Sequence, residues 1–216
     1  MKIWLDTIDS KTIALGHQLG IVSGITTNPA IISDSGKTLE EVIDEVLSIQ
    51  KGPMTVQVTA AHHGEIVEQA ESLREYSERI IVKIPVTQEG FKAMKALSHL
   101  QIPMMATAIF TLEQALLACR VGATYLAPYY SRIPHSLETL EGIVLMLERY
   151  GFDARLVVAS LQDEEQLDDC LQIGVDGVTL KKELFETLVA DQRGTFEALD
   201  EFSKAWKKGK PSKLLP

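Results

Sequence analysis

Lys83 is the residue of this chain with the clearest potential for chemistry, because it interrupts the apolar segment 80–86 (IIVKIPV). A short continuous apolar segment is typical of a parallel strand that is buried on both faces. Burial removes water from an ammonium group and favours the neutral amine, which attacks carbonyl carbon atoms. A lysine with a buried alkyl stem and an ammonium that reaches water or a carboxylate would give the same pattern. The segment alone leaves both interpretations open.

Other polar residues stand where further apolar segments end. They are Asp6, Thr26, Thr27, Asn28, Gln57, Thr59, Thr107, Tyr129, Arg132 and Ser160. A hydrogen bond to nearby backbone would be enough to explain any one of them. Together, however, they come from strand ends that would share one rim of a barrel. With Lys83 they supply an amine nucleophile, a carboxylate and mostly neutral donors and acceptors. Such a set suits Schiff-base chemistry on a carbonyl compound.

Other reaction classes lack the residues that they need. His62 and His63 are adjacent, so their side chains point apart, and no third metal ligand is evident. We interpret them as part of a solvated loop. Ser160 has no histidine partner of the kind that a serine hydrolase requires. We therefore expect neither a metal nor another cofactor.

The elements that would position these residues alternate between strand and helix along the whole chain. Short apolar, β-branched segments predict strands at 2–7, 24–28, 54–59, 80–86, 103–110, 124–130, 155–160 and 176–180. Segments with helical periodicity separate them, such as 38–50, and Thr111 and Ser136 are expected to be N-caps. Eight alternating units favour a closed (β/α)8 barrel, although an open doubly wound sheet is the alternative. That alternative usually has a glycine-rich loop after its first strand, and this chain has Asp6-Thr7-Ile8-Asp9 there.

No linker or low-complexity segment divides the chain, so residues 1–216 are predicted to form a single barrel domain. An additional amphipathic helix is predicted over about 194–208, with Phe196, Leu199, Phe202 and Trp206 on its apolar face. This helix would either cap the barrel or dock on a neighbouring subunit.

The composition excludes several partners. The formal net charge of −9 argues against general binding to nucleic acid or to anionic membranes. The N-terminus reaches Asp6 before an apolar signal region can form, and no apolar segment is long enough to span a bilayer. Cys119 and Cys170 fit two buried thiols in a reducing compartment. We therefore expect a cytoplasmic protein that acts on small molecules.

Several of these segments, taken together, resemble the small transaldolase family. The matching residues are Leu5-Asp6-Thr7, Gly24-Ile25-Thr26-Thr27-Asn28-Pro29, Val82-Lys83-Ile84-Pro85-Val86-Thr87, Thr107-Ala108-Ile109-Phe110, Ala127-Pro128-Tyr129, Arg132-Ile133, Ala159-Ser160 and Trp206. They occur in the order and spacing of the family over nearly the whole chain. The resemblance implies a (β/α)8 barrel and a Schiff base on Lys83. It also implies rings of subunits, commonly pentamers stacked into decamers, in which the C-terminal helix reaches a neighbour.

The family contains transaldolases and fructose-6-phosphate aldolases, and three positions resemble the aldolase branch. Transaldolases have a glutamate in place of Gln57, usually a phenylalanine in place of Tyr129, and often a serine in place of Ala127. Because an amide cannot ionise, Gln57 can only orient a water molecule, whereas the phenol of Tyr129 can act as acid and base. The resemblance therefore implies reversible cleavage of fructose 6-phosphate or of related hydroxyketones. A transaldolase remains the alternative among enzymes. From outside the enzymes, the alternative is a catalytically silent barrel that acts as a carbohydrate-binding or assembly module.

The resemblance also implies a role for each residue of the site. Tyr129 would exchange protons through a water held by Gln57 and Thr107, and Asp6 would orient a hydroxyl of the donor or assist proton transfer. Asn28 and Thr26 would bind the donor, and Arg132 and Ser160 would bind the phosphate of the aldehyde.

One position departs from the family. Gln162 stands where relatives usually have a lysine or an arginine. The missing cation would weaken selection for phosphorylated aldehydes by roughly 1–3 kcal/mol. Lys181 and Lys182 could compensate, but the start of the following helix is the role expected for them.

Overall fold

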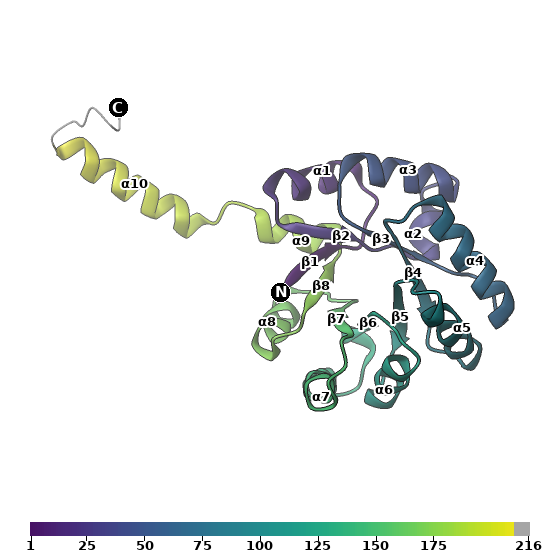
Figure 1. Ribbon diagram of the computed structural model, residues 1–216. Coiled ribbons are helices and arrows are strands. Elements are labelled where there is room, and N and C mark those ends of the chain that lie inside the picture. Colours follow the sequence, from purple (N-terminus) through teal and green to yellow (C-terminus); the bar gives the residue numbers. More distant parts are fainter. Residues whose placement is uncertain (210–216) are drawn as a thin grey trace.

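The computed structural model of the protein describes residues 1–209. Within them, eight parallel strands form a closed barrel in chain order, with β8 paired to β1 (Figure 1). The strands are β1 (Lys2–Leu5), β2 (Val22–Ile25), β3 (Met54–Gln57), β4 (Ile80–Pro85), β5 (Met104–Ile109), β6 (Tyr125–Pro128), β7 (Arg155–Val158) and β8 (Gly177–Leu180). The predicted (β/α)8 barrel is therefore confirmed.

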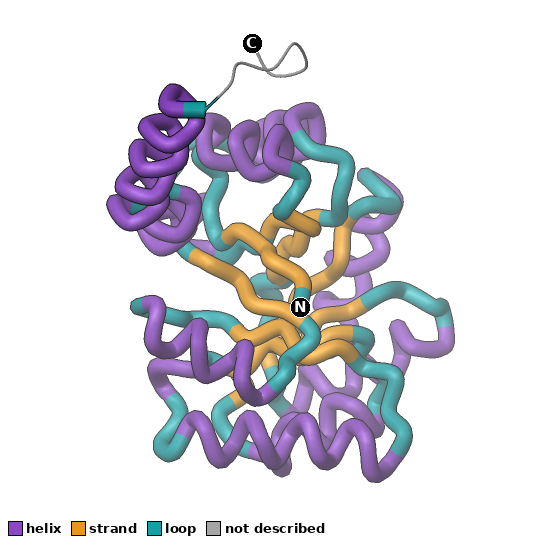
Figure 2. Tube along the Cα trace, turned by 90° about the vertical axis from the view of Figure 1, so that its left-hand side faces the viewer, coloured by secondary structure: helices purple, strands orange, loops and turns teal. Residues whose placement is uncertain are grey.

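Helices surround the strands, as the tube in Figure 2 shows. They are α1 (Ser10–Leu19), α2 (Pro29–Asp34), α3 (Leu39–Ile49), α4 (His63–Tyr76), α5 (Gln88–His99), α6 (Leu112–Arg120), α7 (Ser136–Tyr150), α8 (Glu164–Ile173), α9 (Lys182–Val189) and α10 (Arg193–Lys208), with a 3-10 turn at η1 (Tyr130–Arg132). Over residues 1–209, none of these helices combines the length and the apolar character needed to cross a membrane.

Seven of the eight strands end earlier than the sequence predicts, and only β8 ends at the predicted residue, Leu180. For example, β2 ends at Ile25 and β7 ends at Val158, whereas strands up to residues 28 and 160 were expected. Ser160 has a φ of 65°, in the left-handed region, so the chain turns away from the sheet there. Several of the polar residues expected at strand ends therefore lie in the loops directly beyond them.

Alternation along the strands separates two apolar regions. Ile80, Val82 and Ile84 of β4 belong to the large cluster between the strands and the helices. Ile81 belongs to a smaller cluster that also contains Trp4, Met105, Ala127 and Val157 and fills the barrel interior. Since successive side chains of a strand point to opposite faces, Lys83 faces the interior together with Ile81.

Two predictions about helix starts have different outcomes. Thr111 caps α6, because its side chain accepts a hydrogen bond from the backbone N–H of Gln114. The prediction that Ser136 is an N-cap is wrong, because Ser136 is already the first residue of α7. The cap position is His135, whose φ of 54° lets the chain turn one residue earlier than the sequence indicates.

The histidine pair lies at the start of a helix and not in a simple loop. His62 is the N-cap residue of α4, and His63 is its first residue. The His63 Nδ1 atom lies 2.8 Å from a carboxylate oxygen of Glu89. The expectation of a solvated loop therefore holds only for the exposure of these residues.

Both cysteines are free and buried, Cys119 in α6 and Cys170 in α8. Burial raises the pKa of Cys119 to about 11 and that of Cys170 to about 12. The reactive thiolate form is therefore scarce at neutral pH, which fits a packing role.

Helix α10 extends away from the barrel beyond α9 (Figure 1). Its bounds differ by one residue from the predicted helix at about 194–208. The apolar residues that it carries are between 49% and 67% exposed, namely Phe196, Leu199, Phe202 and Trp206. This helix is therefore an apolar surface without a partner among residues 1–209 of its own chain.

Candidate active site

Lys83 lies on β4 with its side chain inside the barrel and only 3% exposed. Its Nζ donates a hydrogen bond of 3.2 Å to the backbone carbonyl of Thr27. Among residues 1–209 it forms no ion pair. The interpretation of a lysine neutralised by a carboxylate is therefore excluded for this part of the chain.

Asp6 is held beside the mouth of the barrel by a chain of hydroxyl groups. Thr26 Oγ1 donates to Asp6 Oδ1 at 2.8 Å and lies 2.6 Å from Thr179 Oγ1. A hydroxyl group has one proton, so if Thr26 donates to the carboxylate it must accept from Thr179. Thr179 is only 4% exposed and was not identified from the sequence. The available signal was a polar residue between Val178 and Leu180, at an inward position of β8.

Tyr129 and Thr107 form a second hydrogen-bonded pair. Thr107 Oγ1 lies 3.2 Å from Tyr129 Oη, and Thr107 is completely buried. The register of β5 against β6 shifts between Thr107 and Ile109, where Ala108 has a φ of 57°. A bulge of this kind redirects side chains and is common beside active sites. Phe110 packs edge-on against the ring of Tyr129, with ring centres 5.7 Å apart.

Gln57 and Asn28 occupy the side of the rim formed by β2 and β3. Gln57 is paired in register with Lys83 on the neighbouring strand, so the amide and the amine come from adjacent positions. The Oδ1 atom of Asn28 accepts from the backbone N–H groups of Ala30 and Ile31 and thereby caps α2. The oxygen of Asn28 is thus engaged, and its NH₂ group is the part that remains for a ligand.

The segments that follow β6, β7 and β8 bring together a third group of polar side chains. Ser160 Oγ lies 2.8 Å from Ser131 Oγ. Gln162 Nε2 donates to the carbonyl of Ser160 at 3.1 Å, and Lys181 Nζ donates to Gln162 Oε1 at 3.0 Å. The guanidinium of Arg132 stacks 5.3 Å from the ring centre of Tyr129, which connects this group to the phenol. Ser131 was not identified from the sequence, because its place depends on the turn η1.

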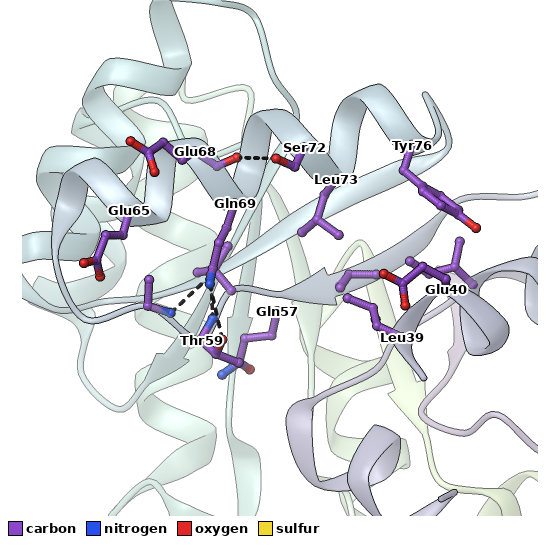
Figure 3. A pocket seen from close by; sticks show the side chains of 14 residues that line it. Leu39, Glu40, Gln57, Thr59, Glu65, Glu68, Gln69, Ser72, Leu73 and Tyr76 are labelled. Carbon is purple, nitrogen blue, oxygen red and sulfur yellow. Dashed lines mark hydrogen bonds between the residues drawn. The ribbon is translucent and has the colours of Figure 1, made fainter. Parts of the chain in front are cut away.

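A groove of about 670 Å³ lies between α3 and α4 (Figure 3). Ile43, Val56 and Leu73 contribute apolar surface to it, and Glu40, Glu65 and Glu68 line it with carboxylates. Gln57 and Thr59 also line the groove, at the end of β3. The groove therefore approaches the same rim from outside the barrel.

The rim can support covalent chemistry on a carbonyl compound. It presents a buried primary amine without a counter-ion in residues 1–209, a phenol bonded to a hydroxyl, and a carboxylate on a third position. An amine can add to a ketone, and a phenol of suitable placement can supply and remove the protons of that addition. The residues predicted from the sequence thus lie on one rim. Thr179 and Ser131, which were not predicted, lie beside Thr26 and Ser160 in the same site.

Comparison with known proteins places this geometry in a family. The sequence pattern described as transaldolase/fructose-6-phosphate aldolase matches residues 3–212. A protein described as a probable transaldolase from Coprothermobacter proteolyticus is 36% identical over 98% of this chain and 100% of its own length. A second probable transaldolase, from Lactiplantibacillus plantarum, is 34% identical over 96% of this chain and 97% of that protein.

The fold is also similar to that of a solved mandelate oxidase variant. The TM-score is 0.58 at 13% sequence identity, over 91% of this chain and 69% of that chain. This similarity supports the barrel and says nothing about the reaction. From the sequence matches, the chain belongs to the transaldolase/fructose-6-phosphate aldolase family of enzymes.

Proposed function

We propose that this protein is a Schiff-base aldolase that reversibly cleaves fructose 6-phosphate to dihydroxyacetone and glyceraldehyde 3-phosphate, or acts on related hydroxyketones. The observation that carries the proposal is the register of Gln57 beside the buried Lys83. The position next to the amine holds an amide, which cannot exchange a proton. The phenol of Tyr129, bonded to Thr107, can exchange one.

The reaction begins at Lys83. Its neutral amine adds to the ketone carbon of the substrate and forms a carbinolamine. Tyr129 delivers a proton to the carbinolamine hydroxyl through a water molecule held by Gln57 and Thr107, and water leaves. The resulting iminium accepts the electron pair of the carbon–carbon bond as that bond breaks, which gives an enamine and releases the aldehyde.

Hydroxyl groups of the donor substrate are bound by residues in the segments that follow β1 and β2. Asp6, oriented by Thr26, accepts a hydrogen bond from a donor hydroxyl and assists the proton transfer that accompanies bond cleavage. Asn28 donates from its NH₂ group, because its oxygen caps α2. Arg132 and Ser160 bind the phosphate of the aldehyde, since a guanidinium matches phosphate oxygens in charge and geometry.

Transfer of the dihydroxyacetone unit to a second sugar is the other candidate reaction. It is supported by the names of the similar proteins from Coprothermobacter proteolyticus and Lactiplantibacillus plantarum, which are described as probable transaldolases. The two reactions share every step up to the enamine. They differ in whether the enamine is protonated and released or attacks an acceptor aldehyde.

Release of dihydroxyacetone from fructose 6-phosphate tests the proposal. An aldolase releases it without an acceptor, whereas a transaldolase requires one such as erythrose 4-phosphate. We expect release at a similar rate with and without the acceptor. Release that occurs only when the acceptor is present would assign the protein to the transaldolases.

Replacement of Gln57 by glutamate should shift this balance. The carboxylate adds a proton-exchanging group beside Lys83, and we expect the ratio of transfer to cleavage to rise by about 10-fold or more. Both products are measured in one reaction that contains fructose 6-phosphate and erythrose 4-phosphate. Gln69→Glu is the matched control, because Gln69 caps backbone N–H groups of residues 59 and 60 away from the amine. An unchanged ratio in Gln57→Glu would count against the assignment to the aldolases.

We further propose that the protein is a homo-oligomer in which α10 docks on a second copy, in the groove between α3 and α4. The exposed apolar residues of α10 match the apolar surface of this groove. Lys207 and Lys208, in the last turn of α10, match the carboxylates of Glu65 and Glu68. In Figure 1, α10 and α4 lie on different sides of the barrel, so one chain cannot fill its own groove.

Replacement of Phe202 by glutamate should reduce the particle mass in light scattering from that of an oligomer to that of a single chain. Phe202 is 67% exposed, so the change leaves the barrel core intact but introduces a charge into the interface. Leu171→Glu, at an apolar residue of α8 that is 53% exposed, should keep the oligomer. A monomeric wild type, or an unchanged mass for Phe202→Glu, would refute this mode of assembly.

A further inference from the structure

A cluster of polar side chains spans the segments that follow β6, β7 and β8. It consists of Ser131, Ser160, Gln162 and Lys181, which we call the Ser160 cluster. Gln162 lies at its centre, because its Nε2 donates to the Ser160 carbonyl and lies 3.4 Å from Ser131 Oγ, and its Oε1 accepts from Lys181. In (β/α)8 barrels the loops after strands 7 and 8 frequently bind phosphate. The cluster therefore lies where an anionic end of a substrate would be expected.

We propose that Lys181 binds the phosphate of the aldehyde and sets the preference of this enzyme for phosphorylated over free aldehydes. The proposal rests on the aldolase function proposed above and concerns the same site. In the ligand-free protein the ammonium of Lys181 is held on the amide oxygen of Gln162, and it moves from there to a phosphate oxygen when substrate binds.

The difference between two neighbouring lysines supports this choice. Lys182 Nζ lies 3.1 Å from a carboxylate oxygen of Asp9 and 3.9 Å from one of Glu186, so its charge is already neutralised. Lys181 is exposed, and its hydrogen bond goes to a neutral amide. A phosphate dianion adds an attraction between opposite charges that the neutral amide lacks, so exchange of partners is favourable. Lys181 is therefore the available cation of the pair.

The remaining members of the cluster complete a phosphate site. The hydroxyl groups of Ser131 and Ser160 lie 2.8 Å apart and can each donate to a different phosphate oxygen. Arg132, which directly follows Ser131, adds a second cation from the side of Tyr129. Two cations and two hydroxyl groups match the charge and the acceptors of a phosphate dianion. Lys181 thus supplies the cation that is missing at position 162, and the phosphate end has two cations. The loss of selection for phosphorylated aldehydes that the sequence predicts from Gln162 should therefore be smaller.

The preference is measured as the ratio of kcat/KM for glyceraldehyde 3-phosphate to that for glyceraldehyde, with dihydroxyacetone as donor. We expect Lys181→Met to lower this ratio by about 10- to 50-fold. This is the lower end of the range for losing a hydrogen bond to a charged group, because the ammonium of Lys181 is exposed to solvent. Lys181→Arg should stay within about 3-fold of the wild type, since it keeps the charge. Lys95→Met, which removes an exposed lysine from α5 on the outer ring, is the control for net charge.

A second substitution distinguishes local placement of the charge from a general effect of the mutation. Because Gln162 and Lys181 are in contact, adding Gln162→Lys to Lys181→Met returns a cation to the same place. The double variant should regain at least half of the lost preference on a logarithmic scale. A preference that stays low in the double variant would show that the position of the charge is not what matters.

Binding of inorganic phosphate provides a readout that does not depend on turnover. Calorimetry should show an affinity about 10-fold weaker for Lys181→Met than for the wild type, and the difference should shrink as salt is raised. An unchanged preference together with unchanged phosphate affinity would overturn the role of Lys181. Failure of the proposed Schiff-base chemistry gives a different result, since the wild type would then form no borohydride-trapped adduct with dihydroxyacetone, which has no phosphate. A transaldolase would form this adduct but would release dihydroxyacetone from fructose 6-phosphate only in the presence of an acceptor.

Discussion

Lys83→Met is expected to abolish turnover, with kcat reduced at least about 10⁴-fold, while the barrel stays folded. The amine is the nucleophile of the proposed reaction, and loss of a nucleophile removes the covalent route entirely. Methionine fills a similar volume inside the barrel and removes a hydrogen bond to the Thr27 carbonyl, which changes stability by about 1 kcal/mol. The folded state is checked by circular dichroism and by the melting temperature.

The same variant tests the Schiff base directly. Borohydride reduction in the presence of dihydroxyacetone should add the mass of the reduced donor to the wild type, and peptide mapping should locate it on Lys83. Lys83→Met should remain unmodified, and Lys95→Met should be modified as the wild type is. An adduct on another lysine, or a wild type without any adduct, would remove the basis of the proposed mechanism.

Tyr129→Phe has the second largest expected effect, a reduction of kcat for fructose 6-phosphate cleavage by about 10²- to 10⁴-fold. This range is typical for the loss of a general acid or base. Phenylalanine keeps the ring that packs edge-on against Phe110 but loses the hydroxyl bonded to Thr107. The effect should therefore fall on the rate and not on the fold.

A matched control is Tyr150→Phe, at a tyrosine of α7 that is 66% exposed, which should leave kcat within about 2-fold of the wild type. Trapping of dihydroxyacetone on Lys83 should be slower in Tyr129→Phe but still detectable, because the amine is intact. Near-normal turnover in Tyr129→Phe would show that another group carries the proton, with Asp6 the first residue to examine.

Much of the architecture was predictable because it depends on local patterns. Segments of continuous apolar residues alternate with helical periodicity, and eight repeats of that alternation leave a closed parallel barrel as the compact solution. Lys83 stood out for the same local reason, since a charged residue interrupted an apolar strand. Polar residues at strand ends were also recognisable, because in a parallel barrel all of these ends meet at one rim.

The partners of these residues depend on contacts between segments that are distant in the sequence. Thr179 reaches Thr26 across 153 residues, and Lys181 reaches Gln162 only because β7 and β8 are neighbours. The sequence contains no periodicity that pairs such residues. The amide oxygen of Asn28 is different, because it caps α2 through backbone N–H groups only two and three residues further along the chain.

Backbone conformation was the other property that the sequence did not indicate. Ala108, His135 and Ser160 all have positive φ values although none is a glycine, so residue type did not announce these turns. They shift the start of α7 and set the directions of the chain at Thr107 and at the Ser160 cluster. By itself, the sequence determined the barrel and singled out the amine of Lys83, because both follow from local pattern. Only the tertiary structure decided which groups surround that amine, because those contacts form when the strands close into a ring.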